Sequence, residues 1–230
     1  MAEELALRTN AVAAGSTLPK RHLPRLSPGD LNSAALAFRA FRVAHPDPVR
    51  PRIVSSAHGS IDHVLLTYPR YVQTELSYER VYADLLSKLP KRTEVTVFVH
   101  PQVEEDLRRI VDEQRQGATT NIVVAPDFLN FTVWAEDPYV VVQDTDPENE
   151  ATFLVEPFTF TRTGDALIAE RVAQSGPLQS TQSPLYFQGG NVLIGDDFVM
   201  LGIDYLYNTL ETFRSSGAVS IPAGVEPFDF

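Results

Sequence analysis

The sequence predicts an α/β protein built from repeated strand and helix units. Short apolar runs that end at proline alternate with segments whose apolar residues recur at the helical period. The alternation repeats roughly every 50–60 residues as strand, strand, helix, strand, and about three such units fit in the chain. Repeats of this kind must stack or close to bury their faces. A hydrophobic fraction of 43% and a charged fraction of 21% suit a chain with a sizeable core.

Residues 1–50 are interpreted as an N-terminal extension that is partly irregular. Within it, residues 33–43 are expected to form one short helix. The following stretch HPDPVRPR is expected to be extended, because its prolines fix φ and remove backbone donors. The repeated domain is therefore expected to span residues 51–230.

The first part of this domain reads as strands alternating with helices. The expected elements are a strand at 61–70, a helix at 77–90, a strand at 93–101, a helix at 102–117 and a strand at 121–126. The first helix places apolar residues at Val81, Leu85, Leu86 and Leu89. Gly117 follows the second helix, where a glycine favours helix termination.

The second part of the domain begins with a strand pair. The expected elements are strands at 134–144 and 151–158, a hairpin at 190–202, a helix at 203–217 and the start of a further strand after it. Residues 159–185 show no clear period, and 175–185 (SGPLQSTQSPL) reads as a loop.

Composition excludes several classes of function. The net charge is −11 and the isoelectric point is about 4.9, which disfavours a nucleic-acid partner and suits a cationic small molecule. Cysteine is absent, so the chain holds no disulfide, thiolate metal site or cysteine nucleophile. Motifs for nucleotides or zinc are missing, and no cofactor or metal is expected. Without a secretory N-terminus or a long apolar run, a cytoplasmic location is expected.

Two short segments group polar residues where strands are expected to open: residues 134–138 (WAEDP) and 187–191 (FQGGN). Carboxylates at such a place suit a guanidinium, whose flat fork of donors a carboxylate can meet with two hydrogen bonds. Simpler interpretations remain open. Asp137-Pro138 can be an ordinary turn, Trp134 can be a packing residue, and Gly189-Gly190 can be a bulge at a strand start.

Together, in this order and spacing, W-x-x-D-P and F-x-G-G-N-V-L resemble the guanidino-modifying enzymes of the pentein superfamily. These include arginine and agmatine deiminases, dimethylargininase and the amidinotransferases. The resemblance covers about residues 60–217 and implies a five-bladed α/β propeller of ββαβ modules, of which about three are present. It implies a reaction in which a cysteine thiolate attacks the guanidinium carbon while a histidine moves protons.

The resemblance also implies roles for individual residues. Asp137 takes the position of the aspartate that holds the substrate guanidinium, and Asn191 a position that is Asp or Asn in the family. Gln188 departs from the acidic residue expected before the two glycines, and Glu136 departs from an arginine. Gly189 and Gly190 would let the backbone pass close to a substrate, beside Trp134.

The chain lacks the second half of such a site. It has no cysteine, and its five histidines all precede Asp137. His58, His63 and His100 are expected to be structural or solvent-facing. One hypothesis is therefore the N-terminal portion of a deiminase- or amidinotransferase-like protein whose nucleophile lies elsewhere. The alternative is a non-catalytic binding protein of the same fold. An incomplete array would expose module edges and favour self-association.

Overall fold

The computed structural model describes residues 47–216, apart from 56–58, 75, 115–116, 149, 159, 161 and 163. The predicted helix at 33–43 and the strand predicted to start after 217 lie outside the described residues. Within the described part, no helix is both long enough and apolar enough to cross a membrane. The mixed α/β class is confirmed by the elements that follow.

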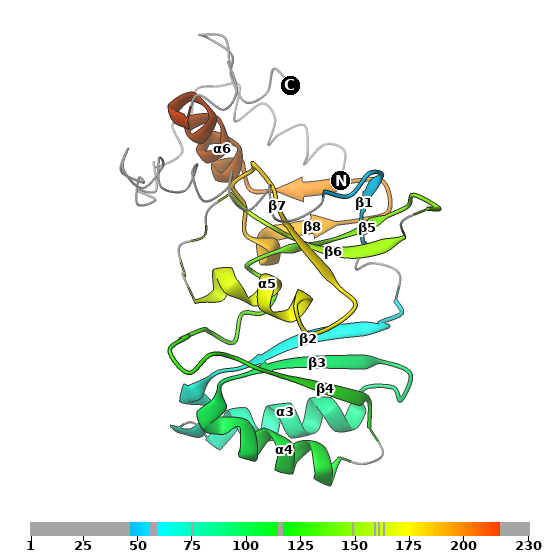
Figure 1. Ribbon diagram of the computed structural model, residues 1–230, viewed down its shortest axis with the longest axis vertical. Coiled ribbons are helices and arrows are strands. Elements are labelled where there is room, and N and C mark those ends of the chain that lie inside the picture. Colours follow the sequence, from blue (N-terminus) through cyan, green and yellow to red (C-terminus); the bar gives the residue numbers. More distant parts are fainter. Residues whose placement is uncertain are drawn as a thin grey trace, which may run out of the picture.

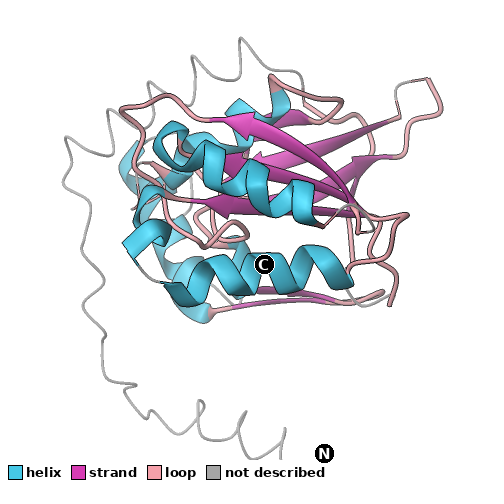
Figure 2. Ribbon diagram, turned by 90° about the horizontal axis from the view of Figure 1, so that it is seen from below, coloured by secondary structure: helices cyan, strands magenta, loops and turns pink. Residues whose placement is uncertain are grey.

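The first layer is a parallel sheet in which the strands follow chain order. It contains β2 (His63–Tyr68), β3 (Glu94–Val99) and β4 (Thr119–Val124). Helices α3 (Leu76–Lys88) and α4 (Glu104–Glu113) connect these strands. All five elements were predicted within a few residues. Both helices cover the same face of the sheet, as Figures 1 and 2 show.

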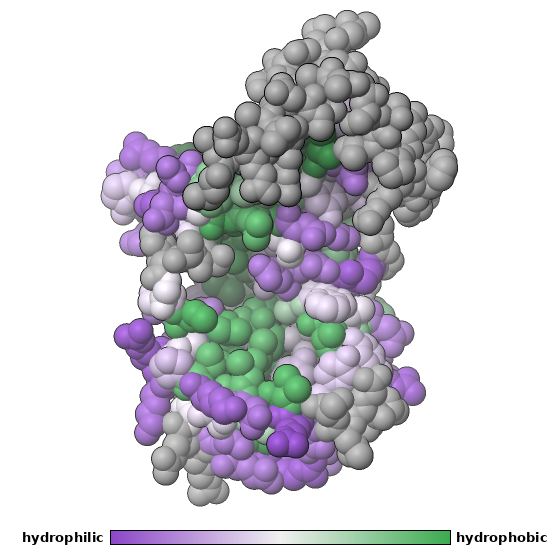
Figure 3. Space-filling view, turned by 180° about the vertical axis from the view of Figure 1, so that it is seen from behind, coloured by the Kyte–Doolittle hydropathy of each residue, from purple (hydrophilic) through white to green (hydrophobic). Residues whose placement is uncertain are grey.

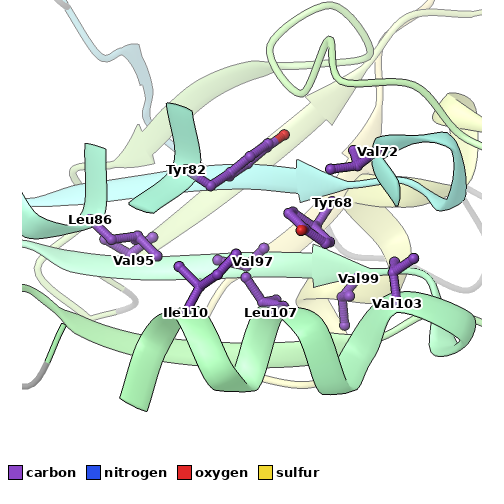
Figure 4. Close-up of a cluster of buried hydrophobic side chains, with 10 residues drawn as sticks. All are labelled: Tyr68, Val72, Tyr82, Leu86, Val95, Val97, Val99, Val103, Leu107 and Ile110. Atoms are coloured by element: carbon purple, nitrogen blue, oxygen red, sulfur yellow. The ribbon is translucent and has the colours of Figure 1, made fainter. Parts of the chain in front are cut away.

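A hydrophobic core fills the space between this sheet and its two helices (Figure 4). Every second residue of β3, namely Val95, Val97 and Val99, is fully buried there, as the pleat of a strand requires. Leu86 is buried as predicted, but Val81 is 57% exposed and Tyr82 is buried in its place. The ring of Tyr82 packs in the core, and its hydroxyl donates a hydrogen bond to the Thr67 carbonyl, so the buried polar group has a partner.

The second sheet has the order β1-β5-β6-β7. Its strands are β1 (Pro51–Ile53), β5 (Val140–Asp144), β6 (Ala151–Glu156) and β7 (Gln179–Gln182). Strands β5 and β6 form an antiparallel pair, and β7 runs parallel to β6 after helix α5 (Ile168–Ala173). The unit β5-β6-α5-β7 therefore has the predicted order of strand, strand, helix, strand.

Two predictions in this region were wrong. The strand predicted at 134–144 begins only at Val140, because residues 135–138 form a turn before it. The loop predicted at 175–185 contains β7, a strand whose sequence Gln-Ser-Thr-Gln has no apolar alternation. This strand is held by its ladder to β6 and by the burial of Ser180 and Thr181 rather than by apolar side chains.

Helix α5 lies between the two sheets (Figure 1). It contributes Ile168, Ala169 and Val172 to a second core, which also takes in Phe98 from the other face of β3 and Leu154 from β6. This second core therefore lies between the two sheets and is shared by both.

The last described elements are the hairpin of β8 (Val192–Ile194) and β9 (Val199–Leu201), followed by helix α6 (Ile203–Ser216). The hairpin and the helix were predicted. The described strands form three separate sheets, and no closed ring of strands is seen among them. The propeller architecture remains an expectation.

Candidate functional site

The segment 134–138 forms a tight turn directly before β5. The Asp137 amide donates to the Trp134 carbonyl at 3.3 Å, and the Ala135 amide donates to the Val133 carbonyl at 3.0 Å. Ala135 is buried under the turn, whereas the Trp134 side chain is 62% exposed. The turn thus directs Asp137 away from the ladder of the sheet, toward the following segment at 187–191.

That second segment contains a 3₁₀ turn, η4 (Gly189–Asn191), immediately before β8. The Gly189 amide donates to the Asp137 carbonyl at 2.8 Å. A Cβ atom on Gly189 would lie 1.9 Å from the Tyr139 carbonyl oxygen and 2.2 Å from that of Glu136. The two predicted segments therefore meet, although Phe187 follows Asp137 by 50 positions in the sequence.

This contact gives the two glycines different environments. Gly189 is buried against protein backbone, so the space of its missing side chain is taken by the 134–138 turn and not by a ligand. Gly190 is exposed, and a Cβ atom there would lie 2.3 Å from Oδ1 of Asp137. Of the two glycines, Gly190 alone has the Asp137 carboxylate next to the position that its side chain would take.

The Asp137 carboxylate holds a guanidinium from its own chain. Nη2 of Arg162 lies 2.5 Å from Oδ2 of Asp137, and Nε of Arg162 donates to Oδ2 of Asp165. Asp165 is fully buried and accepts two further bonds, from the Thr132 amide at 2.7 Å and the Thr132 hydroxyl at 2.8 Å. Two carboxylates thus grip one guanidinium from two sides, and with both ionised the cluster has one excess negative charge.

The environment of Arg162 keeps it charged. Burial alone would lower the pKa of its guanidinium, but hydrogen bonds to Asp137 and Asp165, and their charges, raise that pKa above its ordinary value. The guanidinium carbon also lies 5.0 Å from the centre of the Phe160 ring, within range of a cation–π contact. Sequence reasoning missed Arg162 and Asp165, because both fall in the stretch 159–185 that shows no period.

A cavity of about 570 Å³ opens beside this cluster. Its polar side is formed by Glu136, Asp137, Arg162, Gly190 and Asn191. Its apolar side is formed by Leu65, Leu66, Val133, Trp134 and Ala135. Figure 3 shows that apolar residues also gather around a hollow in the middle of one face of the molecule. The lining combines carboxylates with apolar side chains, which suits a cation that carries a hydrocarbon portion.

Gln188 is absent from the residues that line this cavity, unlike Asn191. The Gln188 Oε1 atom accepts from the Asn191 amide at 3.0 Å and from the Tyr205 hydroxyl at 3.1 Å. The Asn191 amide also contacts the Tyr205 hydroxyl at 2.7 Å. These three residues brace the η4 turn against α6, and the oxygen of Gln188 is already occupied.

The histidines expected to be structural lie elsewhere. Nε2 of His63 contacts the Thr96 hydroxyl at 2.9 Å, and Nδ1 of the buried His100 accepts the Gln102 amide at 3.2 Å. His58 lies outside the described residues. Within the described part of the chain, no group of three or more His, Cys, Asp or Glu side chains could hold a metal ion.

Comparisons with known proteins give a likeness to solved structures only. No family model matches the chain, and no curated protein matches it. The C. jejuni agmatine deiminase is 11% identical to this chain, with a TM-score of 0.48. The matched region covers 64% of this chain and 44% of the deiminase chain. A structural-genomics protein provisionally described as an agmatine deiminase is 15% identical to this chain, with a TM-score of 0.49. The matched region covers 68% of this chain and 46% of that protein's chain. The chain spans less than half the length of either protein.

Proposed function

We propose that this chain binds a guanidino compound in the cavity beside Asp137, as part of a deiminase- or amidinotransferase-like protein. The observation that carries the proposal is the guanidinium of Arg162 between Asp137 and Asp165. A carboxylate that already pairs with a planar cation inside an open cavity has the position and charge needed to bind such a cation from solution.

The cavity also fits the remainder of such a ligand. Beside the carboxylate, Gly190 leaves room at Oδ1 of Asp137, and Asn191 adds an amide at the rim. Leu65, Leu66 and Trp134 also line the cavity and provide apolar surface for a hydrocarbon chain. The cluster's excess negative charge would favour the positive ligand over a neutral one.

A thiolate mechanism on the bound ligand would require a cysteine from outside these 230 residues, because the chain has none. A thiolate that attacks the guanidinium carbon displaces one nitrogen as an amine and leaves an amidino thioether. Water would complete a hydrolysis, whereas a second amine would complete an amidino transfer. In either reaction Asp137 would hold the guanidinium nitrogens and fix the orientation of the carbon.

A second candidate is a protein of the same fold that binds its ligand without catalysis. One observation favours it: position 188 carries an amide, and its oxygen is taken up by Asn191 and Tyr205 instead of facing the cavity. The cavity therefore holds the guanidinium with fewer carboxylates than the resemblance implies.

Isothermal titration calorimetry of agmatine and arginine into the purified chain tests the proposal. The Asp137→Asn variant should lose at least tenfold in affinity, because it removes the charge that pairs with the guanidinium. Asp112→Asn is the matched control, since Asp112 is exposed on α4 and lies outside this cavity. Equal binding by the Asp137 variant and the wild type would exclude Asp137 as the anchor.

A further inference from the structure

The two ends of the Arg162 guanidinium are held unequally. Its Nε end faces Asp165, which is fully buried and fixed by the Thr132 amide and hydroxyl. A charged hydrogen bond in so buried a place is costly to break, because the carboxylate would be left without its cation. This end is the anchor.

The other end of the guanidinium faces the cavity. Its Nη2 atom meets Asp137, whose side chain is 19% exposed, and the Arg162 side chain itself is 31% exposed. Among the described residues, no second side chain is seen to donate a hydrogen bond to the Asp137 carboxylate. Water and small cations can therefore reach this pair, and separating it costs less than separating the pair with Asp165.

We propose that Arg162 is an internal guanidinium that competes with the ligand for Asp137. In the free protein its Nη2 end occupies the carboxylate; an incoming guanidinium or amidinium cation displaces that end, while Nε stays on Asp165. This inference rests on the proposed function and adds a specificity device to it. An alkylammonium ligand should displace Arg162 from Asp137 poorly, because it lacks the planar set of N–H donors with which a guanidinium meets a carboxylate.

Such competition lowers the apparent affinity of the site. If the carboxylate is free only a fraction of the time, the apparent dissociation constant is the intrinsic one divided by that fraction. Occupancy by Arg162 of about 90% or more therefore weakens binding about tenfold or more. Removing Arg162 should therefore increase the apparent affinity by the same factor. Removing a residue that binds the ligand directly should instead lower the affinity.

The test is agmatine binding by calorimetry to the wild type and to Arg162→Lys. Lysine keeps a positive charge for Asp165, but its compact ammonium cannot span both carboxylates. Arg162→Lys should bind agmatine about tenfold or more tightly than the wild type, and 1,4-diaminobutane should gain less. Arg108→Lys is the control, because Arg108 lies on α4 and pairs only with Glu104 among the described residues.

A second variant guards against misfolding. The double change Arg162→Gln with Asp165→Asn removes the competitor without leaving a buried unpaired charge, and circular dichroism checks its fold. It should also bind agmatine more tightly than the wild type, and adding Asp137→Asn to either variant should abolish the gain.

The possible outcomes separate the two proposals. Binding by the wild type that is unchanged or weaker in both folded Arg162 variants overturns the competition and leaves the proposed function standing. Absence of binding by the wild type and by both variants overturns the proposed function, and the competition with it. Tighter binding by the variants supports both.

Discussion

At the scale of single residues, Glu156 is the most unusual ionisable group of the described chain. It ends β6 with a side chain only 7% exposed, and its Oε1 atom has no hydrogen-bond partner among the described residues. Burial, together with the charge of Glu170, raises the pKa of Glu156 to about 8, although a hydrogen bond from the Glu170 backbone acts in the opposite direction. The protonated form is therefore the stable one in the folded chain.

This raised pKa makes folding stability depend on pH. The folded chain keeps a proton that the unfolded chain releases near the ordinary pKa of 4.5, so the free energy of unfolding falls as pH rises from about 4.5 to about 8 and then levels off. Glu156→Gln should be more stable than the wild type by about 4 to 5 kcal/mol at pH 8.5, with little difference at pH 4. Urea unfolding at both pH values measures this. The exposed Glu150→Gln is the control, and the same gain at both pH values would contradict the linkage.

The candidate site shows what residue patterns do and do not reveal. Asp137, Gly190 and Asn191 line one cavity. Their two segments were selected because polar residues stand where strands were expected to open, and the roles expected of these residues came from the family resemblance. Arg162 could not be found in this way, because its link to Asp137 is a tertiary contact between segments 25 residues apart. The only local signal is an arginine three residues before an aspartate, which is too common to be specific.

At the scale of elements, apolar periodicity decided which segments could be predicted. The helix α4 buries one face and was predicted from its helical period. The strand β3 is buried on both faces and was predicted as a short apolar run that ends before a proline. β7 was missed, because hydrogen bonds to β6 hold a polar segment in place. The segment 134–139, which contains the turn at 135–138, was predicted as strand because apolar residues continue into it from β5, although Asp137-Pro138 bends the backbone.

The contact between the two turns depends on Gly189. Gly189→Ala should lower the free energy of unfolding by about 3 kcal/mol, because its Cβ would overlap the carbonyl oxygens of Tyr139 and Glu136, which belong to the backbone and cannot move aside. Thermal unfolding followed by circular dichroism measures the loss. Gly176→Ala is the matched control, because a Cβ atom at Gly176 would lie 3.9 Å from the nearest atom, the Val172 carbonyl oxygen. Equal melting temperatures for the two variants would show that the turns do not support each other.

At the scale of the whole molecule, the sequence predicted the kinds of layers but not how they pair. The pairing of β1 with β5 joins residues more than 80 positions apart and depends on Asp144, which is fully buried and accepts the backbone amides of Val49 and Arg50 at 2.8 and 2.9 Å. No local pattern identifies such a partner. The division of the described strands into three sheets is likewise a result of tertiary packing.

The smallest of these sheets is also the most exposed. On the hairpin of β8 and β9, Leu193, Phe198, Val199 and Met200 are between 51% and 62% exposed. Leu193 and Met200 are direct cross-strand partners, so their side chains form a continuous apolar surface on a sheet of only two strands. Unpaired strand edges and apolar surface of this kind favour contact between copies of a chain.

We therefore expect the isolated chain to self-associate through this hairpin. Sedimentation velocity should show an average mass that rises with protein concentration. The double change Leu193→Glu with Met200→Lys should abolish the rise, because it replaces the apolar pair by an oppositely charged pair that still suits the antiparallel ladder. Phe128→Lys is the control, since Phe128 is 76% exposed in the segment between β4 and β5. Association that persists in the hairpin variant but disappears in the Phe128 variant would move the contact surface away from β8 and β9.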